Sequence, residues 1–235
     1  MRPEFSKAPR GFTLVEVVVL LGVVAVLAAL TFPSLSRSTS RAETAGCAAK
    51  LRSLGNAIHL YALDNQGEFP RSFHSAGAFG QPGWTSSIFP YLSGGSGDLD
   101  AENFRRLYRC PSHSEKNPFI YSYGMNVHFE LDPNGDDYTG SPATWRRVSQ
   151  VPHPTRTILL GESRPVPFGD HLMCHQWSTS TAAKNALAAD RHEGRPSFLF
   201  VDGHVENLKP EQTLDPARNL NLWNPSLAGK SASAP

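Results

Sequence analysis

The sequence predicts an α+β fold in which a long N-terminal helix packs on a small antiparallel β-sheet head. Three observations predict it: an apolar run over residues 12–32, an amphipathic stripe over residues 47–61, and a hairpin pattern over residues 197–208. The chain has 235 residues, enough for one sizeable core. Its 22 basic and 21 acidic residues leave a net charge of +1. No basic field is available to hold a polyanion, so we expect no nucleic-acid partner.

The apolar run predicts a transmembrane helix over residues 12–32. Its sequence is FTLVEVVVLLGVVAVLAALTF, and its one ionisable residue is Glu16. A helix of this length rises about 31 Å, which matches a bilayer core of about 30 Å. A secretory signal has a shorter apolar core, and a buried core helix is not usually apolar on every face. Basic residues before the span predict a cytoplasmic N-terminus and an exported C-terminal portion. They are Arg2, Lys7 and Arg10.

The presence of Glu16 in this run requires an explanation. Placing a carboxylate inside a membrane segment costs free energy, so such a residue usually has a function. It lies one helical turn after Phe12. Cleavage between Gly11 and Phe12 would create an α-amino group one turn from this carboxylate. In an assembly, that amine of one subunit can neutralise Glu16 of a neighbour. The alternative is a lone glutamate whose side chain reaches the membrane interface.

The segment Arg10-Gly11-Phe12-Thr13-Leu14-Val15-Glu16 resembles the class III signal of type IV prepilins and type II secretion pseudopilins. The resemblance implies a leader over residues 1–11 and a pilin-like fold. A prepilin peptidase would cut after Gly11 and, as an N-methyltransferase, methylate Phe12. Glu16 would be the carboxylate used in assembly with other pilin or pseudopilin subunits. The protein would span the bacterial inner (cytoplasmic) membrane once, with a periplasmic head.

An amphipathic continuation of the helix is predicted over residues 33–65. Its apolar stripe has alternating steps of four and three residues: Cys47, Leu51, Leu54, Ile58 and Tyr61. We expect the helix to end near Asp64-Asn65-Gln66-Gly67, since Gly67 is a stop signal. The extracytoplasmic head then covers residues 66–224, and a disordered tail covers residues 225–235.

The C-terminal part of the head contains an H-x9-DG motif: His192, then nine residues, then Asp202-Gly203. The pattern predicts a strand over residues 197–201, a type I′ turn at Asp202-Gly203 and a return strand over residues 204–208. Turn geometry explains Asp202 and Gly203 without a catalytic or metal-binding role. His192 would fix the start of the strand by a hydrogen bond. The motif, together with the N-terminus, resembles bacterial prepilin-type proteins that carry H-x9-DG. Lys50 stands where their usual pattern has Asn.

The cysteines leave two alternatives open. Cys47, Cys110 and Cys174 include no C-x-x-C pair. Outside the cytoplasm a Cys47–Cys110 disulfide is one interpretation. Three unpaired, partly buried thiols are the other.

We expect no cofactor, with zinc and calcium as alternatives. The candidate metal ligands are His171, Cys174, His175, His192 and His204. No tetrahedral ligand set is legible for His192, Asp202 and His204, two of which flank a tight turn. The side chains of the segment Asp170–His175 could converge on zinc if that segment is a strand or a loop, but accidental clustering in a head with nine histidines is the simpler interpretation. The segment Asp132–Asp137 resembles the start of a calcium loop, but it lacks the sixth-position glycine and has Ala143 in place of the twelfth-position carboxylate.

Three classes of function remain at this point. The first is a structural pilin-like subunit. We do not expect an enzyme, because the sequence has no G-x-S-x-G, P-loop, H-E-x-x-H or dinucleotide-binding pattern. A membrane-anchored module that binds a glycan, a protein or a metal is the second. Four tryptophans are candidates to line its site: Trp84, Trp145, Trp177 and Trp223. An exported metal-dependent hydrolase is the third.

Overall fold

The computed structural model describes residues 11–230 except 94–97, 118–119, 131–144 and 167–168, and it leaves out the side chains of residues 30–37, 74 and 93. The chain divides into two units, residues 1–42 and residues 43–235. Each unit is described by itself. The calcium-loop candidate, Asp132–Asp137, lies outside the described residues.

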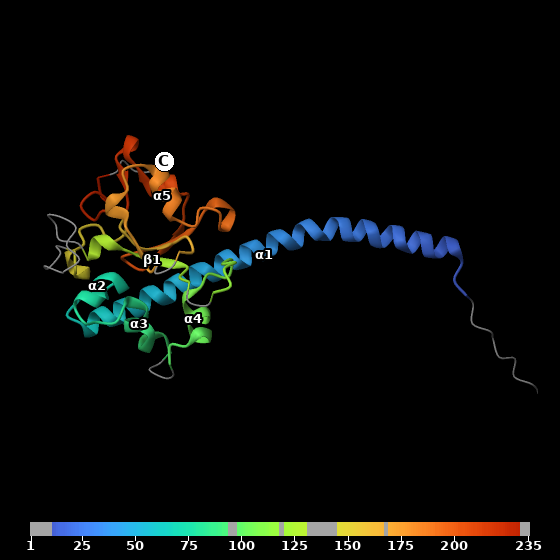
Figure 1. Ribbon diagram of the computed structural model, residues 1–235. Helices are drawn as coiled ribbons and strands as arrows, with labels where there is room; N and C mark the ends of the chain where they lie inside the picture. The colour runs from blue at the N-terminus through green and yellow to red at the C-terminus, as the bar shows by residue number, and fades with distance from the viewer. Residues whose placement is uncertain (1–10, 94–97, 118–119, 131–144, 167–168, 231–235) are drawn as a thin grey trace, which may run out of the picture. The chain divides into compact units, whose positions relative to one another are not determined.

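One long helix, α1 (Leu14–Asp64), contributes residues to both units (Figure 1). It ends where the sequence predicted. The amide N–H of Gly67 donates to the carbonyl of Ala62 at 2.7 Å, and Gln66 and Gly67 have positive φ values of 57° and 81°. These left-handed residues turn the chain out of the helix, which explains why glycine stands at the stop.

In the first unit, the large apolar side chains that the structure describes are between 45% and 81% exposed. They are Phe12, Leu14, Val15, Val17, Val18, Val19, Leu20, Leu21, Val23, Val24, Val26 and Leu27. Within the described part of the chain, no helix combines the length and the hydropathy that a membrane crossing requires. The membrane span over residues 12–32 stays a prediction.

In the second unit, α1 packs on the sheet through the predicted stripe. Cys47, Leu51, Leu54 and Ile58 are fully buried, which confirms the amphipathic pattern. Gly55 allows a close approach of the helix to the sheet, because a Cβ there would lie 2.9 Å from a methyl group of Leu199.

The main sheet has five strands in the order β3-β1-β2-β4-β5. Their bounds are β1 Tyr123–Asn126, β2 Ile158–Glu162, β3 His171–Leu172, β4 Ser197–Phe200 and β5 Val205–Asn207. The pairs β1–β2, β2–β4 and β4–β5 are antiparallel, but β3 runs parallel to β1. The prediction of an antiparallel sheet is therefore wrong at this edge. A second, two-stranded sheet pairs β6 (Leu214–Asp215) with β7 (Leu220–Asn221).

The predicted hairpin is present, but its turn differs. The N–H of Gly203 donates to the carbonyl of Phe200 at 2.9 Å, and the N–H of Phe200 donates to the carbonyl of His204 at 2.9 Å. Gly203 has a φ of 94°, whereas Asp202 does not have a positive φ. A type I′ turn needs positive φ at both central residues, so the loop is instead a three-residue loop over 201–203 with glycine at the left-handed position.

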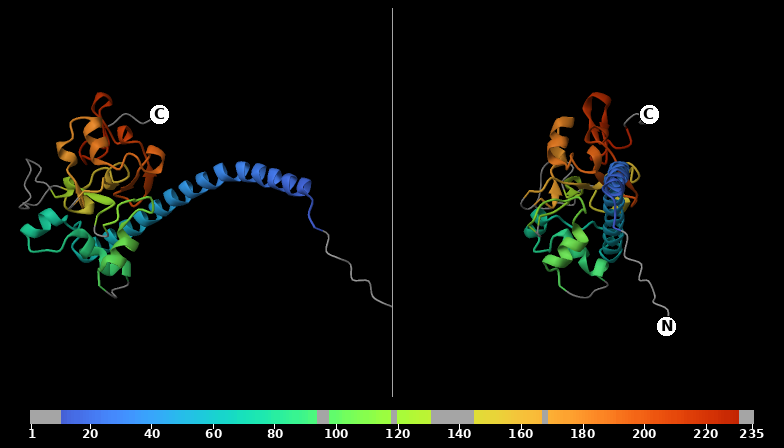
Figure 2. Two further views of the ribbon diagram at one scale, coloured as in Figure 1. Left: turned by 45° about the vertical axis from the view of Figure 1, so that its right-hand side comes forward. Right: turned by 90° about the vertical axis from the view of Figure 1, so that its right-hand side faces the viewer.

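Short helices and the C-terminal segment complete the head. The helices are α2 (Phe73–Ala78), α3 (Trp84–Ser93), α4 (Ala101–Tyr108) and α5 (Ser180–Ala186). In both views of Figure 2, α2–α4 gather at one side of the head, and the orange-to-red C-terminal part lies at the other. Ala228 is fully buried, and its carbonyl accepts a hydrogen bond of 3.0 Å from Arg156. The packed chain therefore extends beyond Pro225, where the sequence predicted a disordered tail.

Two hydrophobic clusters lie on the two faces of the sheet. Strand β4 shows the division, because its side chains alternate between the faces. Leu199, and Val201 just after the strand, pack in the cluster that includes the α1 stripe. Phe198 and Phe200 pack in the cluster around Trp223.

Candidate functional site

The predicted cleavage site lies just before α1. Gly11 and Phe12 are exposed and outside regular secondary structure, and the helix begins at Leu14. Thr13 and Glu16 form a capping box, because the Thr13 N–H donates to the Glu16 carboxylate at 2.8 Å and the Glu16 N–H donates to the Thr13 hydroxyl at 3.3 Å. The T-x-x-E spacing carries this signal in the sequence. Glu16 therefore has a local role at the start of the helix, alongside the predicted role in assembly.

The H-x9-DG residues do not come together in one site. Asp202 is exposed at the hairpin loop, and its carboxylate pairs with His204 Nδ1 at 2.5 Å. His192 is buried and belongs to a different group of side chains. Gly203 has the turn role that the sequence predicted for it, whereas the role of His192 depends on residues far away in the sequence.

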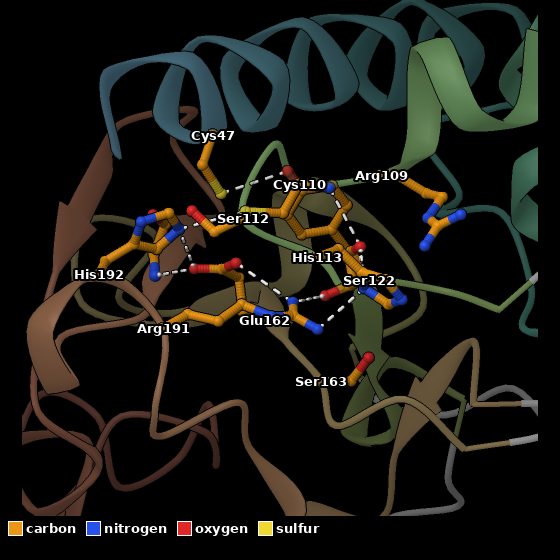
Figure 3. Close-up of polar contacts among 12 residues, drawn as sticks. Cys47, Arg109, Cys110, Ser112, His113, Ser122, Glu162, Ser163, Arg191 and His192 are labelled. Carbon is orange, nitrogen blue, oxygen red and sulfur yellow. Dashed lines mark hydrogen bonds and ion pairs between the residues drawn. The ribbon is translucent and has the colours of Figure 1, made fainter. Parts of the chain in front are cut away.

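Four side chains that could ligate a metal lie close together where α1 packs on the head (Figure 3). We call them the buried cluster. Its members are Cys47, Cys110, Glu162 and His192. Each offers one ligand atom, and these atoms all lie within 4.8 Å of one another. All four residues are at most 8% exposed.

The fold supplies each member of the buried cluster from a different element. Cys47 lies on the apolar stripe of α1, and Cys110 follows α4. Glu162 is the last residue of β2, at the end of an apolar run that carries it into the core. His192 opens the 3₁₀ turn η4 (His192–Gly194). The chain thus brings together residues up to 145 positions apart, because Cys47 and His192 lie at the two ends of the set.

His192 and Glu162 form the ionic centre of the buried cluster. His192 Nε2 lies 3.1 Å from Glu162 Oε2 and 3.2 Å from Cys110 Sγ. Burial lowers the pKa of His192, but hydrogen bonds to Cys110 and Glu162 and the charge of Glu162 outweigh burial and raise the pKa to about 10. Burial raises the pKa of Glu162, but His192 and Arg191 outweigh it and hold that pKa below its usual value.

A second layer of polar groups orients the buried cluster. The Arg191 guanidinium lies 3.3 Å from Glu162 Oε1, and the Ser197 N–H donates to Glu162 Oε2 at 2.7 Å. Ser197 is the first residue of β4, so His192 fixes the start of that strand through Glu162 and not by a direct hydrogen bond. Cys47 Sγ lies 3.2 Å from the hydroxyl of Tyr123.

All three cysteines are free thiols in this structure, so the geometry corresponds to the unpaired alternative. Cys110 is hydrogen-bonded with Cys47, and this contact, followed by burial, raises the pKa of the Cys110 thiol. Cys174 is remote from them, and its thiol donates to Asn126 Oδ1 at 2.9 Å. The two thiols that the sequence paired as a candidate disulfide are thus neighbours.

Of the five predicted metal-ligand candidates, His192 alone joins a group of three or more ligand atoms among the described residues. His171 pairs with Asp170 at 2.9 Å, and His175 makes a ring contact with His128 at 6.4 Å. His204 pairs with residues of its own hairpin. Sequence reasoning missed Glu162 as a site residue. A carboxylate that ends the apolar run ILLGE was the available signal, because a buried acid requires a partner.

The tryptophans offer limited support for a binding module. Trp84 and Trp223 are fully buried in the two hydrophobic clusters. Trp145 packs against the edge of the first cluster. Trp177 lines a surface pocket together with Leu214 and Leu220. Core packing therefore accounts for most of these side chains.

Similar proteins fall in bacterial secretion and competence systems. The chain is 38% identical over 56 residues to type II secretion system core protein G of Escherichia coli, covering 24% of this chain and 39% of that protein. The same protein of Pectobacterium carotovorum is 38% identical over 56 residues, covering 24% and 36% of the two chains. Competence protein ComGC of Halalkalibacterium halodurans is 33% identical over 55 residues, covering 23% and 54%.

The chain spans between 36% and 54% of the length of these curated relatives. No family model matches the chain, and no solved structure matches it. The matches support a relationship to pilin-like and pseudopilin-like proteins over this short region.

Proposed function

We propose that this chain is a pilin-like structural subunit, and not an enzyme, that assembles through its N-terminal helix into a secretion pseudopilus or a pilus-like structure. Prepilin peptidase removes residues 1–11 after Gly11 and methylates Phe12. Residues 12–32 lie in the bacterial inner membrane, with the head on the periplasmic side. Other pilin or pseudopilin subunits are its partners.

The exposed apolar surface of α1 carries this proposal. In the first unit, every large apolar side chain that the structure describes is at least 45% exposed. A continuous apolar surface of this extent is unfavourable in water and is typical of a membrane or protein interface. The curated relatives add support, since two of those named above are core proteins of type II secretion systems.

Variants at Glu16 test the assembly role, because the capping box separates two functions of the carboxylate. Glu16→Gln keeps an oxygen that can accept from the Thr13 N–H but removes the charge, whereas Glu16→Ala removes both. Thr13→Val removes the hydroxyl from the capping box and keeps the charge. If charge neutralisation between subunits drives assembly, Glu16→Gln and Glu16→Ala both lose incorporation, and Thr13→Val retains most of it.

Crosslinking of subunits in membranes of the producing bacterium measures incorporation. All three variants should remain in the membrane fraction. Full incorporation of Glu16→Gln would show that the charge has no role in assembly. If Glu16→Ala stays in the membrane without crosslinking to other subunits and the protein keeps its biological function, the alternative is favoured. That alternative is an anchored binding module that uses the signal for export.

A further inference from the structure

We propose that the buried cluster is a structural zinc site that holds the N-terminal helix to the head. This proposal goes beyond the proposed function, and it concerns residues 43–235 alone. It does not require that the chain be processed or assembled.

The ligand atoms are of the right kind, and their separations are close to those of a zinc site. Zinc takes cysteine sulfur, histidine nitrogen and carboxylate oxygen, with bonds of about 2.0–2.3 Å. In a tetrahedral site with such bonds, neighbouring ligand atoms are about 3.3–3.8 Å apart. His192 Nε2 lies 3.1 Å from Glu162 Oε2 and 3.2 Å from Cys110 Sγ, and all four ligand atoms fall within 4.8 Å. Separations near the 4.8 Å limit would have to shorten by about 1 Å to complete the coordination.

The outer layer matches that of a metal site. A metal-bound histidine usually bonds its second ring nitrogen to a neighbouring polar group, which fixes the orientation of the ring. The second nitrogen of His192, Nδ1, lies 3.1 Å from the hydroxyl of Thr44. Glu162 is held by the Ser197 N–H and by Arg191, and Cys47 is held by the Tyr123 hydroxyl. Each of these three ligands thus has a partner outside the cluster.

The backbone at His192 is held in an unusual conformation. His192 and Glu193 have φ values of 51° and 58°, in the left-handed region that non-glycine residues rarely adopt. Backbone strain of this kind clusters at functional sites, where surrounding contacts maintain it. Here the conformation aims the imidazole of His192 at Glu162 and Cys110, as Figure 3 shows.

The site would be structural, because its four protein ligands leave no open position for a substrate. Binding of one Zn²⁺ replaces the two thiol protons and the proton between His192 and Glu162, and these leave to solvent. Two thiolates and a carboxylate then give the zinc site a net charge of −1. Arg191, 3.3 Å from Glu162, offsets that charge. The metal would join α1, the segment after α4, β2 and η4.

Metal analysis of the full chain, purified under reducing conditions, tests the proposal. The probe is zinc alone, and we expect about one zinc per chain. Cys47→Ser and Cys110→Ser should bind zinc more than about tenfold more weakly. Cys174→Ser is the matched control, because its thiol is equally buried but lies outside the cluster, and it should keep full binding.

A second measurement uses the unaltered chain, so its result does not depend on whether the cysteine variants fold. Cobalt substituted at the site should give a thiolate-to-metal charge-transfer band, and addition of zinc should remove it. Absence of this band, or zinc binding that survives in both Cys47→Ser and Cys110→Ser, would overturn the proposal. A Cys47–Cys110 disulfide in the chain isolated from cells would overturn it as well, since the same two sulfurs cannot do both.

Discussion

The side-chain Nδ2 of Asn126, at the end of β1, donates a hydrogen bond of 2.7 Å to the carbonyl oxygen of Trp223, 97 residues further along the chain. The same Nδ2 donates to the carbonyl of Ile158 at 2.7 Å. Its Oδ1 accepts from the His128 N–H and from the Cys174 thiol, each at 2.9 Å. One fully buried amide therefore ties the C-terminal segment to the sheet.

We expect Asn126→Ala to lower the free energy of unfolding by about 2–4 kcal/mol, because two carbonyls, one N–H and one thiol lose their partner inside the core. Asn56→Ala, at an exposed position of α1, is the control and should change it by less than about 1 kcal/mol, because only helix propensity differs. Urea denaturation measures both. Equal stability of the two variants would contradict the role assigned to Asn126.

Gly161 provides a test of packing between β2 and the C-terminal segment. A Cβ at this position would lie 2.7 Å from the indole of Trp223 and 3.2 Å from the ring of Phe198. Both rings are rigid and buried, so we expect Gly161→Ala to destabilise the fold by about 1–3 kcal/mol. Gly77→Ala in α2 meets no atom within 4 Å and should not destabilise. Thermal unfolding of the two variants measures the effect. If Gly161→Ala unfolds at the same temperature as the unaltered chain, Trp223 can move aside and the packing argument is contradicted.

Acid sensitivity should depend on His128. Burial, followed by the charge of His175, lowers the pKa of His128 to about 4. The folded state therefore disfavours the protonated imidazole, and the unfolded state takes up the proton first as the pH falls. The stabilisation is present above pH 6.5, the ordinary value, and is lost between there and about pH 4. The loss amounts to about 3 kcal/mol.

His128→Phe removes this proton and should reduce the difference in unfolding free energy between about pH 7.5 and about pH 5. Part of the difference should remain, because burial and then Arg191 and Arg109 lower the pKa of His113 to about 4 as well. Urea titrations at the two pH values give the result. An unchanged difference in His128→Phe would contradict the assignment.

Helix α1 could be predicted from the sequence because its signals are long. Its apolar stripe repeats over several turns, and Gly67 marks its end. The helices α2–α4 could not be predicted, because they have six to ten residues and do not complete a clear helical period. The parallel pairing of β3 was missed for a related reason, since two residues carry no alternation.

The buried cluster could be predicted only in part. The sequence identified Cys47 and Cys110 as potential partners and His192 as a motif residue, but nothing local connects them to Glu162. Cys110 and His192, for example, are 82 positions apart, and tertiary packing alone brings them together. The type I′ turn was wrong because Asp-Gly also suits a three-residue loop, in which glycine alone takes the left-handed position.

The N-terminus of the chain extracted from membranes of the producing bacterium tests the central claim most directly. Mass spectrometry should find a chain that begins at Phe12 and carries one added methyl group on its α-amino nitrogen. Recovery of the chain with residues 1–11 still attached, in cells with an active prepilin peptidase, would contradict the proposed function.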